Sequence, residues 1–291
     1  MFAKGKHIKQ LTKAFKKSPK TKVKTQKAKS QGVRSSKNTN RTSMQIKGKE
    51  FTSIYEAETH FRNMGIDVDL SKCTDMRQLT QLDTELAKVK AMGIESQVKS
   101  ITITPFDNHS LVEKARLKGI EDSIRETIRE NGGNISWAYG CSHDGHIFMN
   151  PNGFRRMANG SDVIKHEIGH YHRNVLKDNF YGTAENANEM YVSAIKNIAQ
   201  KTNMTKEQVV DKLTSKLHSE VKAYSHEADE NFADMFSLMI DGKQYSKGAM
   251  LFYDMAGGGR IPNKVINGMK YDDYICNLYE DAENILMNYI K

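Results

Sequence analysis

The chain has 291 residues, 38% of them hydrophobic, which is enough to bury a core and excludes a disulfide-stapled miniprotein. The net charge is +9, but it is unevenly distributed. Residues 1–49 contain fourteen lysines, two arginines and no acidic residue, whereas the other 242 residues contain 28 basic and 35 acidic ones. A segment of charge +16 therefore precedes a region of charge −7, which excludes a uniformly basic nucleic-acid-binding protein.

The sequence predicts neither a transmembrane segment nor a secretory signal. Its longest apolar runs are far shorter than the ~20 residues that cross a bilayer, so no transmembrane segment is predicted. Closely spaced lysines at the N-terminus leave no room for the apolar part of a secretory signal, so no signal peptide is predicted. Cys73, Cys141 and Cys276 form no CxxC pair, which argues against a disulfide framework and against a thiolate zinc site.

Residues 1–49 are predicted to be a disordered basic tail, because lysine and small polar residues dominate them and few large apolar side chains are present. Such a tail would bind DNA or another polyanion through the release of counterions. Phe2, Ile8, Leu11 and Phe15 could share one face of a short helix on an anionic surface, and a solvated tail is the alternative.

The next part of the chain predicts both helices and strands. In chain order we expect a helix over 53–65, a helix over 74–93, a strand over 99–104, a helix over 111–130 and a hairpin of strands 135–141 and 146–150. Ser53 and Glu56 form a capping box at the start of the first helix. Asp144-Gly145 is the strongest hairpin signal in the chain.

Helices dominate the rest of the chain. Apolar residues recur at helical spacing over 161–176, 183–200, 205–222, 225–240 and 271–290, and Ser225 is the expected cap of the fourth of these helices. Early strands followed by a run of helices indicate an α+β fold. We divide the chain into the tail 1–49, a small helical segment 50–94 and a main domain 95–291.

One motif stands above the rest: His166-Glu167-Ile168-Gly169-His170, an HExxH pattern. On a helix, residues four apart lie on one face, so both imidazoles can reach one zinc ion. Glu167 is offset by about 100° and lies beside the metal, where its carboxylate can act on a zinc-bound water. Gly169 suits a close approach of another backbone, although a simple packing role is equally consistent.

A catalytic zinc site normally needs a third protein ligand. Residues 224–239 predict a second helix that carries acidic residues among apolar ones. Glu230 and Asp234 share one of its faces, which suits one ligand and one carboxylate that orients a zinc-bound histidine. Glu227 lies on the same face and is the alternative ligand. His172 is too close in sequence to His170 to share its face, so it is a poor third ligand.

Together, HEIGH and the stretch YSHEADENFADMFSLM resemble the zincin metallopeptidases of the gluzincin type, and more closely the anthrax lethal factor catalytic-domain family. Related domains occur in phage head-associated proteins and polymorphic toxins. The resemblance covers about residues 95–241 and implies a zincin-like domain. It implies His166, His170 and Glu230 as ligands of Zn2+, Glu167 as general base, Asp234 as the partner of a liganding histidine and Tyr224 as a hydroxyl that stabilises the transition state.

The expected function is a zinc-dependent endopeptidase that acts on a protein or peptide substrate, in a virion or in the cytoplasm of a host cell. The hairpin would offer Ser136 to Gly140 as an edge strand for the substrate. Trp137 would lie in a pocket or in the core, and the core is the preferred prediction. Two alternatives remain: a catalytically idle zincin-fold structural protein that binds nucleic acid or capsid through the tail, and a toxin effector protease.

Overall fold

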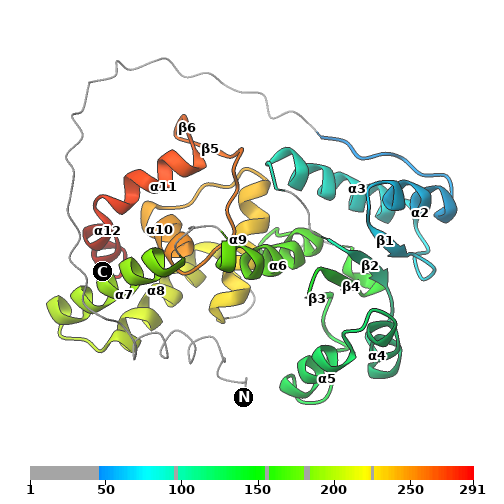
Figure 1. The fold of residues 1–291 in the computed structure, drawn as a ribbon, viewed down its shortest axis with the longest axis horizontal. Coiled ribbons are helices and arrows are strands. Elements are labelled where there is room, and N and C mark those ends of the chain that lie inside the picture. The colour runs from blue at the N-terminus through cyan, green and yellow to red at the C-terminus, as the bar shows by residue number, and fades with distance from the viewer. Residues whose placement is uncertain (1–45, 95–97, 155–156, 180–183, 224–225) are drawn as a thin grey trace. The chain divides into compact units, whose positions relative to one another are not determined.

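The computed structural model describes residues 46–94, 98–154, 157–179, 184–223 and 226–291, and for 173–179 and 184–189 the backbone alone (Figure 1). Nearly all of the basic tail lies outside these residues, as do Tyr224 and Ser225. The disorder of the tail, the role of the Tyr224 hydroxyl and the Ser225 cap therefore stay predictions. Residues 47–291 form one compact unit. This unit combines helices with a small mixed sheet, which confirms the α+β class.

The main sheet has four short strands in the order β1-β2-β4-β3. The strands are β1 (Asp67–Asp69), β2 (Ser100–Ile103), β3 (Gly140–His143) and β4 (His146–Met149). Strand β2 runs parallel to both β1 and β4, and β3 pairs antiparallel with β4 at the edge. All four residues of β2 are buried, although its sequence alternates, because a central parallel strand is covered on both faces.

The hairpin of β3 and β4 turns at Asp144-Gly145, where both residues have positive φ, 46° and 81°. This is the conformation that the Asp-Gly pair favours, so the predicted turn is confirmed. The first strand, however, begins at Gly140, and Ser136 and the three residues after it lie in turns and irregular structure. Trp137 is 54% exposed and its indole donates to the carbonyl of Asn134, so its predicted place in the core is wrong.

Helices α2 (Ile54–Asn63) and α3 (Met76–Ala91) agree with the first two predicted helices. Ser53 caps α2 as expected, but the Glu56 carboxylate accepts from Thr52 rather than completing a box with Ser53. Strand β1 lies between these helices and joins the main sheet, so residues 50–94 contribute to the same sheet as the residues that follow. The domain boundary at residue 94 stays a prediction.

The predicted helix over 111–130 is wrong, because two helices occupy this region. Helices α4 (Asn108–Leu117) and α5 (Glu121–Glu130) are separated at Gly119, whose φ of +74° is one that glycine adopts readily. The break lets both helices pack on one buried cluster that includes Phe106, Leu111 and Ile124. Continuous helical spacing of apolar residues across Gly119 conceals this break in the sequence.

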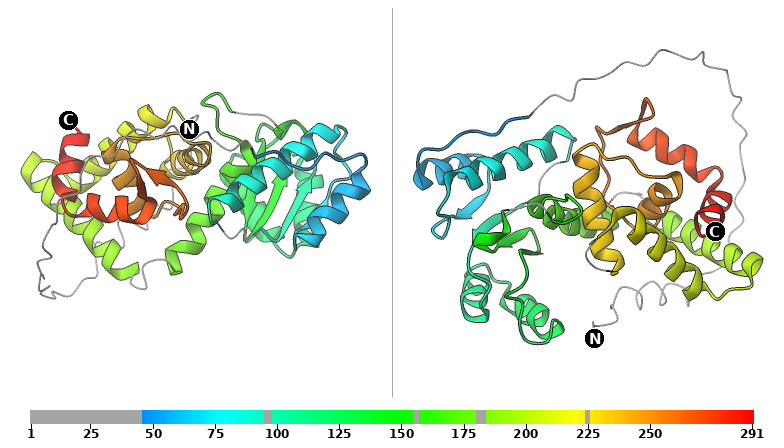
Figure 2. Two further views of the ribbon diagram at one scale, coloured as in Figure 1. Left: turned by 90° about the horizontal axis from the view of Figure 1, so that it is seen from above. Right: turned by 180° about the vertical axis from the view of Figure 1, so that it is seen from behind.

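The C-terminal half is helical, as expected, with some differences in boundaries (Figure 2). Its elements are the 3-10 turn η1 (Pro151–Gly153), α6 (Val163–Asn179), α7 (Ala184–Thr202), α8 (Lys206–Val221), α9 (Ala228–Ile240), α10 (Lys247–Met255), β5 (Val265–Ile266), β6 (Met269–Lys270), α11 (Tyr271–Tyr279) and α12 (Ala282–Tyr289). The predicted helix over 271–290 is divided between α11 and α12. Among the described helices, none is long and apolar enough to cross a membrane.

Helices α6 and α9 pack against each other, and this pair positions the candidate site (Figure 1). Asp162 precedes α6 and its carboxylate caps the helix, accepting from the backbone N–H groups of Ile164 and Lys165. A Cβ at Gly169 would lie 3.1 Å from the Cα of Ala233 in α9. The glycine of HEIGH therefore permits the close approach of the two helices.

Candidate metal centre

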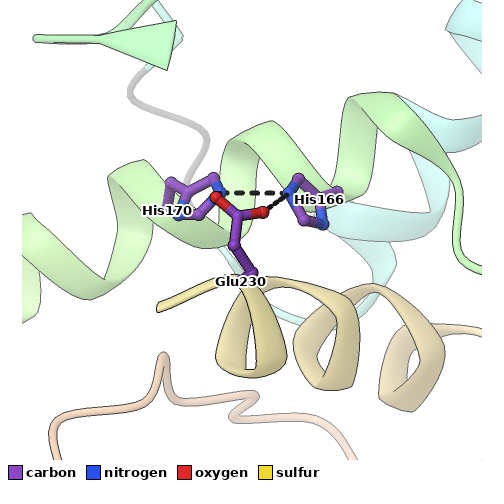
Figure 3. Close-up of side chains that lie close together, drawn as sticks. All are labelled: His166, His170 and Glu230. Carbon is purple, nitrogen blue, oxygen red and sulfur yellow. Dashed lines mark hydrogen bonds and ion pairs between the residues drawn. The ribbon is translucent and has the colours of Figure 1, made fainter. Parts of the chain in front are cut away.

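Three side chains from α6 and α9 bring their donor atoms together (Figure 3). His166 and His170 lie on one face of α6, and their Nε2 atoms are 3.0 Å apart. Glu230, from the first turn of α9, places one carboxylate oxygen 3.1 Å from His166 Nε2 and the other 3.6 Å from His170 Nε2. All three donor atoms lie within 4.8 Å of one another, and this group could hold a metal ion.

The spacing of these atoms suits a zinc ion. Ligands that lie ~2.0–2.1 Å from tetrahedral zinc are about 3.3 Å from one another, which is close to the three separations found here. Two imidazoles and one carboxylate are also ligand types that zinc accepts. The side chains of His170 and Glu230 are each 22% exposed, so the group can be reached from solvent. The residues present therefore fit a zinc ion.

Asp234 bonds the ring nitrogen of His166 that is not part of the converging group. Its Oδ1 atom accepts a hydrogen bond of 2.8 Å from His166 Nδ1, and this bond leaves the Nε2 lone pair directed at the cluster. Ser161 and Asn159, which both precede α6 in the sequence, donate to the same carboxylate. The Ser161 hydroxyl donates to Oδ1 at 2.7 Å and the Asn159 amide donates to Oδ2 at 2.8 Å. The fully buried Asp234 carboxylate thus has three donors and keeps a proton on Nδ1 of His166.

The charges within the cluster shift the pKa values of its members. Burial alone would lower the pKa of His166, but its hydrogen bonds to Asp234 and Glu230 hold that pKa well above the usual value. Burial alone would raise the pKa of Glu230, but His170 and His166 hold it well below the usual value. The cluster therefore brings together groups whose charged forms stabilise one another.

Glu167 lies on α6 between the two histidines in sequence and is 5% exposed. Burial raises the pKa of its carboxyl group, while the nearby His166 and His170 lower it less strongly. A carboxyl group whose pKa moves toward neutrality can both accept and return a proton. Its neighbours in strand β3 are Gly140 and Ser142.

The structure separates the two carboxylates between which sequence spacing could not choose. Glu227 is the N-cap of α9, is exposed, and is not among the three side chains that converge. Burial raises the pKa of its carboxyl group, and the nearby Glu230 and Glu130 raise it further. His172 donates instead to the carbonyl of Arg260, at 2.8 Å, and burial lowers its pKa. Tyr224 lies outside the described residues.

Asn159 and Ser161 precede α6 in the sequence, where such residues commonly begin a helix. The structure gives them a second role as donors to Asp234, which is 73 residues from Ser161 along the chain. No sequence signal indicated this role, because both residue types are common before helices for local reasons.

No family model, curated protein or solved structure matches this chain.

Proposed function

We propose that the chain is a zinc-dependent endopeptidase with a zincin-like domain of the gluzincin type. The observation that carries the proposal is the convergence of His166, His170 and Glu230 with Glu167 on the same helix turn. Two imidazoles at positions i and i+4 and a carboxylate from a second helix are the donor set of a catalytic zinc site that keeps one position for water.

The described residues can divide the chemistry among them. When bound, zinc supplies Lewis-acid chemistry, which acidifies water and polarises a carbonyl group. Glu167 would take a proton from the attacking water on its carboxylate and return it to the leaving amine. Asp234 would hold the Nδ1 proton of His166, so that Nε2 stays available as a ligand. Stabilisation of the transition state by the Tyr224 hydroxyl stays part of the proposal.

The proposed substrate is a protein or peptide. Strand β3 is at the edge of the main sheet and packs against α6, the helix that carries HEIGH. An extended peptide could add to this edge by backbone hydrogen bonds, which favours peptides over small esters. Because residues 136–139 are not in a strand, the proposed pairing segment is Gly140–His143 rather than the one expected from the sequence.

The decisive test replaces the general base. Glu167→Gln should keep one zinc per chain, because the ligands remain, and should lower the hydrolysis of fluorescein-labelled casein by about 100- to 10,000-fold. Zinc is measured by elemental analysis and cleavage by the release of labelled peptides. A glutamine variant that cleaves at the wild-type rate would contradict the role of Glu167, and a wild-type chain without zinc would contradict the proposal as a whole.

The ligand set has its own matched pair of variants. Glu230→Ala should weaken zinc binding by at least about 100-fold, because a tetrahedral site then loses a third of its protein ligands. Glu227→Ala removes a carboxylate three residues away that is not part of the group, so zinc binding should stay unchanged. Competition with a fluorescent chelator measures both affinities, and the opposite result would assign the third ligand to Glu227.

The basic tail supports a separate proposal, contact with DNA or another polyanion. Its charge of +16 lies within residues 1–49, ahead of the residues that form the proposed site. Deletion of these residues should abolish salt-sensitive binding to duplex DNA and leave casein hydrolysis unchanged. Loss of hydrolysis together with DNA binding would instead link the tail to catalysis.

A further inference from the structure

Strand β3 meets helix α6 at Glu167. Gly140 and Ser142 are two residues apart in the strand, so they face the same side of the sheet. That side packs against α6, and both residues contact Glu167 from it. The edge strand therefore contacts the proposed general base directly.

The contact at Gly140 depends on the absence of a side chain. A Cβ at this position would lie 2.7 Å from Oε1 of Glu167 and 2.9 Å from Cγ1 of Val163. A real Cβ is essentially never this close to another heavy atom, so at least one of these side chains would have to move. The backbone of Gly140 lies outside the left-handed region that requires glycine, so its conformation would accept alanine. Glycine at this position thus leaves space for the side chains of Glu167 and Val163.

The contact at Ser142 is a hydrogen bond. The Ser142 hydroxyl donates to the main-chain carbonyl of Glu167 at 3.1 Å. This bond fixes the position of β3 along the axis of α6. It does so at Glu167, the same residue whose carboxylate lies against Gly140. A carboxyl group with several rotatable bonds has many positions open to it, and the strand surface restricts them.

We infer that Gly140 is a positioning residue, which with Ser142 sets the location of the Glu167 carboxylate beside the metal centre. Any side chain at position 140 would push the carboxylate from this location without touching the three converging ligands. The catalytic meaning of this contact rests on the proposed function. The contact itself is a property of the fold and can be tested without metal or substrate.

A double-mutant cycle tests the contact. Gly140→Ala should lower the melting temperature by roughly 3–10 °C, because overpacking forces the carboxylate or the strand to move. In a Glu167→Ala background, the same substitution should cost clearly less, since the contact with the carboxylate is gone and only the one with Val163 remains. An equal loss in both backgrounds would overturn the inference. If Gly140→Ala alone does not fold, the double variant should fold, and its failure would also overturn it.

Gly259→Ala provides a matched control. Its added Cβ would lie 2.7 Å from Cδ2 of His172, another α6 side chain, and is also compatible with the backbone. This substitution should destabilise the protein equally in the wild-type and Glu167→Ala backgrounds. Coupling of Gly259→Ala to Glu167 would mean that the cycle reports a general loosening of α6, which overturns the assignment to Gly140.

Zinc content and kinetics separate this inference from the proposed function. Gly140→Ala should keep one zinc per chain and lower kcat for labelled casein by about 100-fold, with KM unchanged. An unchanged kcat would overturn the positioning role. If the wild-type chain binds no zinc, the proposed function fails, whereas the melting-temperature cycle still decides the contact between Gly140 and Glu167.

Discussion

Neighbouring residues on α6 enter two buried polar networks of different kinds. Lys165, which is fully buried, forms ion pairs with Glu85 of α3 and, at 2.6 Å, with Asp241 at the end of α9. Here each charge faces an opposite charge. His166, the next residue, instead has a second imidazole nitrogen 3.0 Å from its own, and both nitrogens share the carboxylate of Glu230.

The difference shows which buried polar groups point to a ligand. Opposite charges in direct contact satisfy one another, so the network of Lys165 is complete within the protein. Nitrogen lone pairs that face each other repel unless a proton or a cation lies between them. The convergence of like donor atoms, rather than burial of charge as such, therefore marks the candidate function of α6.

Breaking the ion-pair network of Lys165 should lower the stability of the protein most. Lys165→Met leaves two carboxylates with less compensation in a buried place, and we expect a loss of about 3–5 kcal/mol in the free energy of unfolding. Urea denaturation measures this loss. The variant that remains folded should still bind one zinc per chain, because the converging ligands are untouched. Loss of zinc from the folded variant would contradict the separation of the two networks.

Removing the hydrogen-bond partner of His166 should change metal affinity more than stability. Asp234→Ala removes the acceptor of the His166 Nδ1 proton, and we expect a 10- to 100-fold weaker affinity for zinc, about the usual effect of such partners. Ser161→Ala removes one of three donors to that carboxylate and should cost less than about 10-fold. Chelator competition measures both. Equal effects of the two substitutions would contradict this order.

A second buried lysine, Lys264, extends the comparison with Lys165. Lys264 donates to the carbonyl of Met239 at 2.6 Å, and burial lowers its pKa to about 8. Because the folded pKa lies below the unfolded one, the cost of burying this charge is fully present below pH 8 and declines as the pH rises toward about 10.5.

Lys264→Met should therefore stabilise the protein by about 2 kcal/mol at pH 7. The gain should disappear between about pH 8 and 10.5, where the wild-type lysine loses its proton. The carbonyl of Met239 keeps the backbone N–H of Gly242 as a donor, at 3.1 Å, so it is not left unsatisfied. Thermal unfolding of both chains across this pH range is the measurement, and a pH-independent difference would contradict the expected titration.

The secondary structure that local signals determine was predicted well. Helical spacing predicted α2, α3, α6 and α8, Ser53 marked the start of α2, and the Asp-Gly pair predicted the hairpin turn. Two features of the helices are not predicted, each for its own reason. Helix α10 was missed because nearly all its residues are buried, so it has no polar face to reveal a helical period. The break at Gly119 was missed because apolar spacing continues across it.

Sequence by itself determined that His166 and His170 share a helix face with Glu167 beside them, because four-residue spacing on a helix is a local property of the chain. Only the tertiary structure brought Glu230 rather than Glu227 to the histidines, since both carboxylates are compatible with that spacing and the start of α9 at Ala228 decides between them. Contacts between distant segments likewise decided the partners of Asp234 and the glycine beside Glu167, because such contacts leave no periodic trace in the sequence.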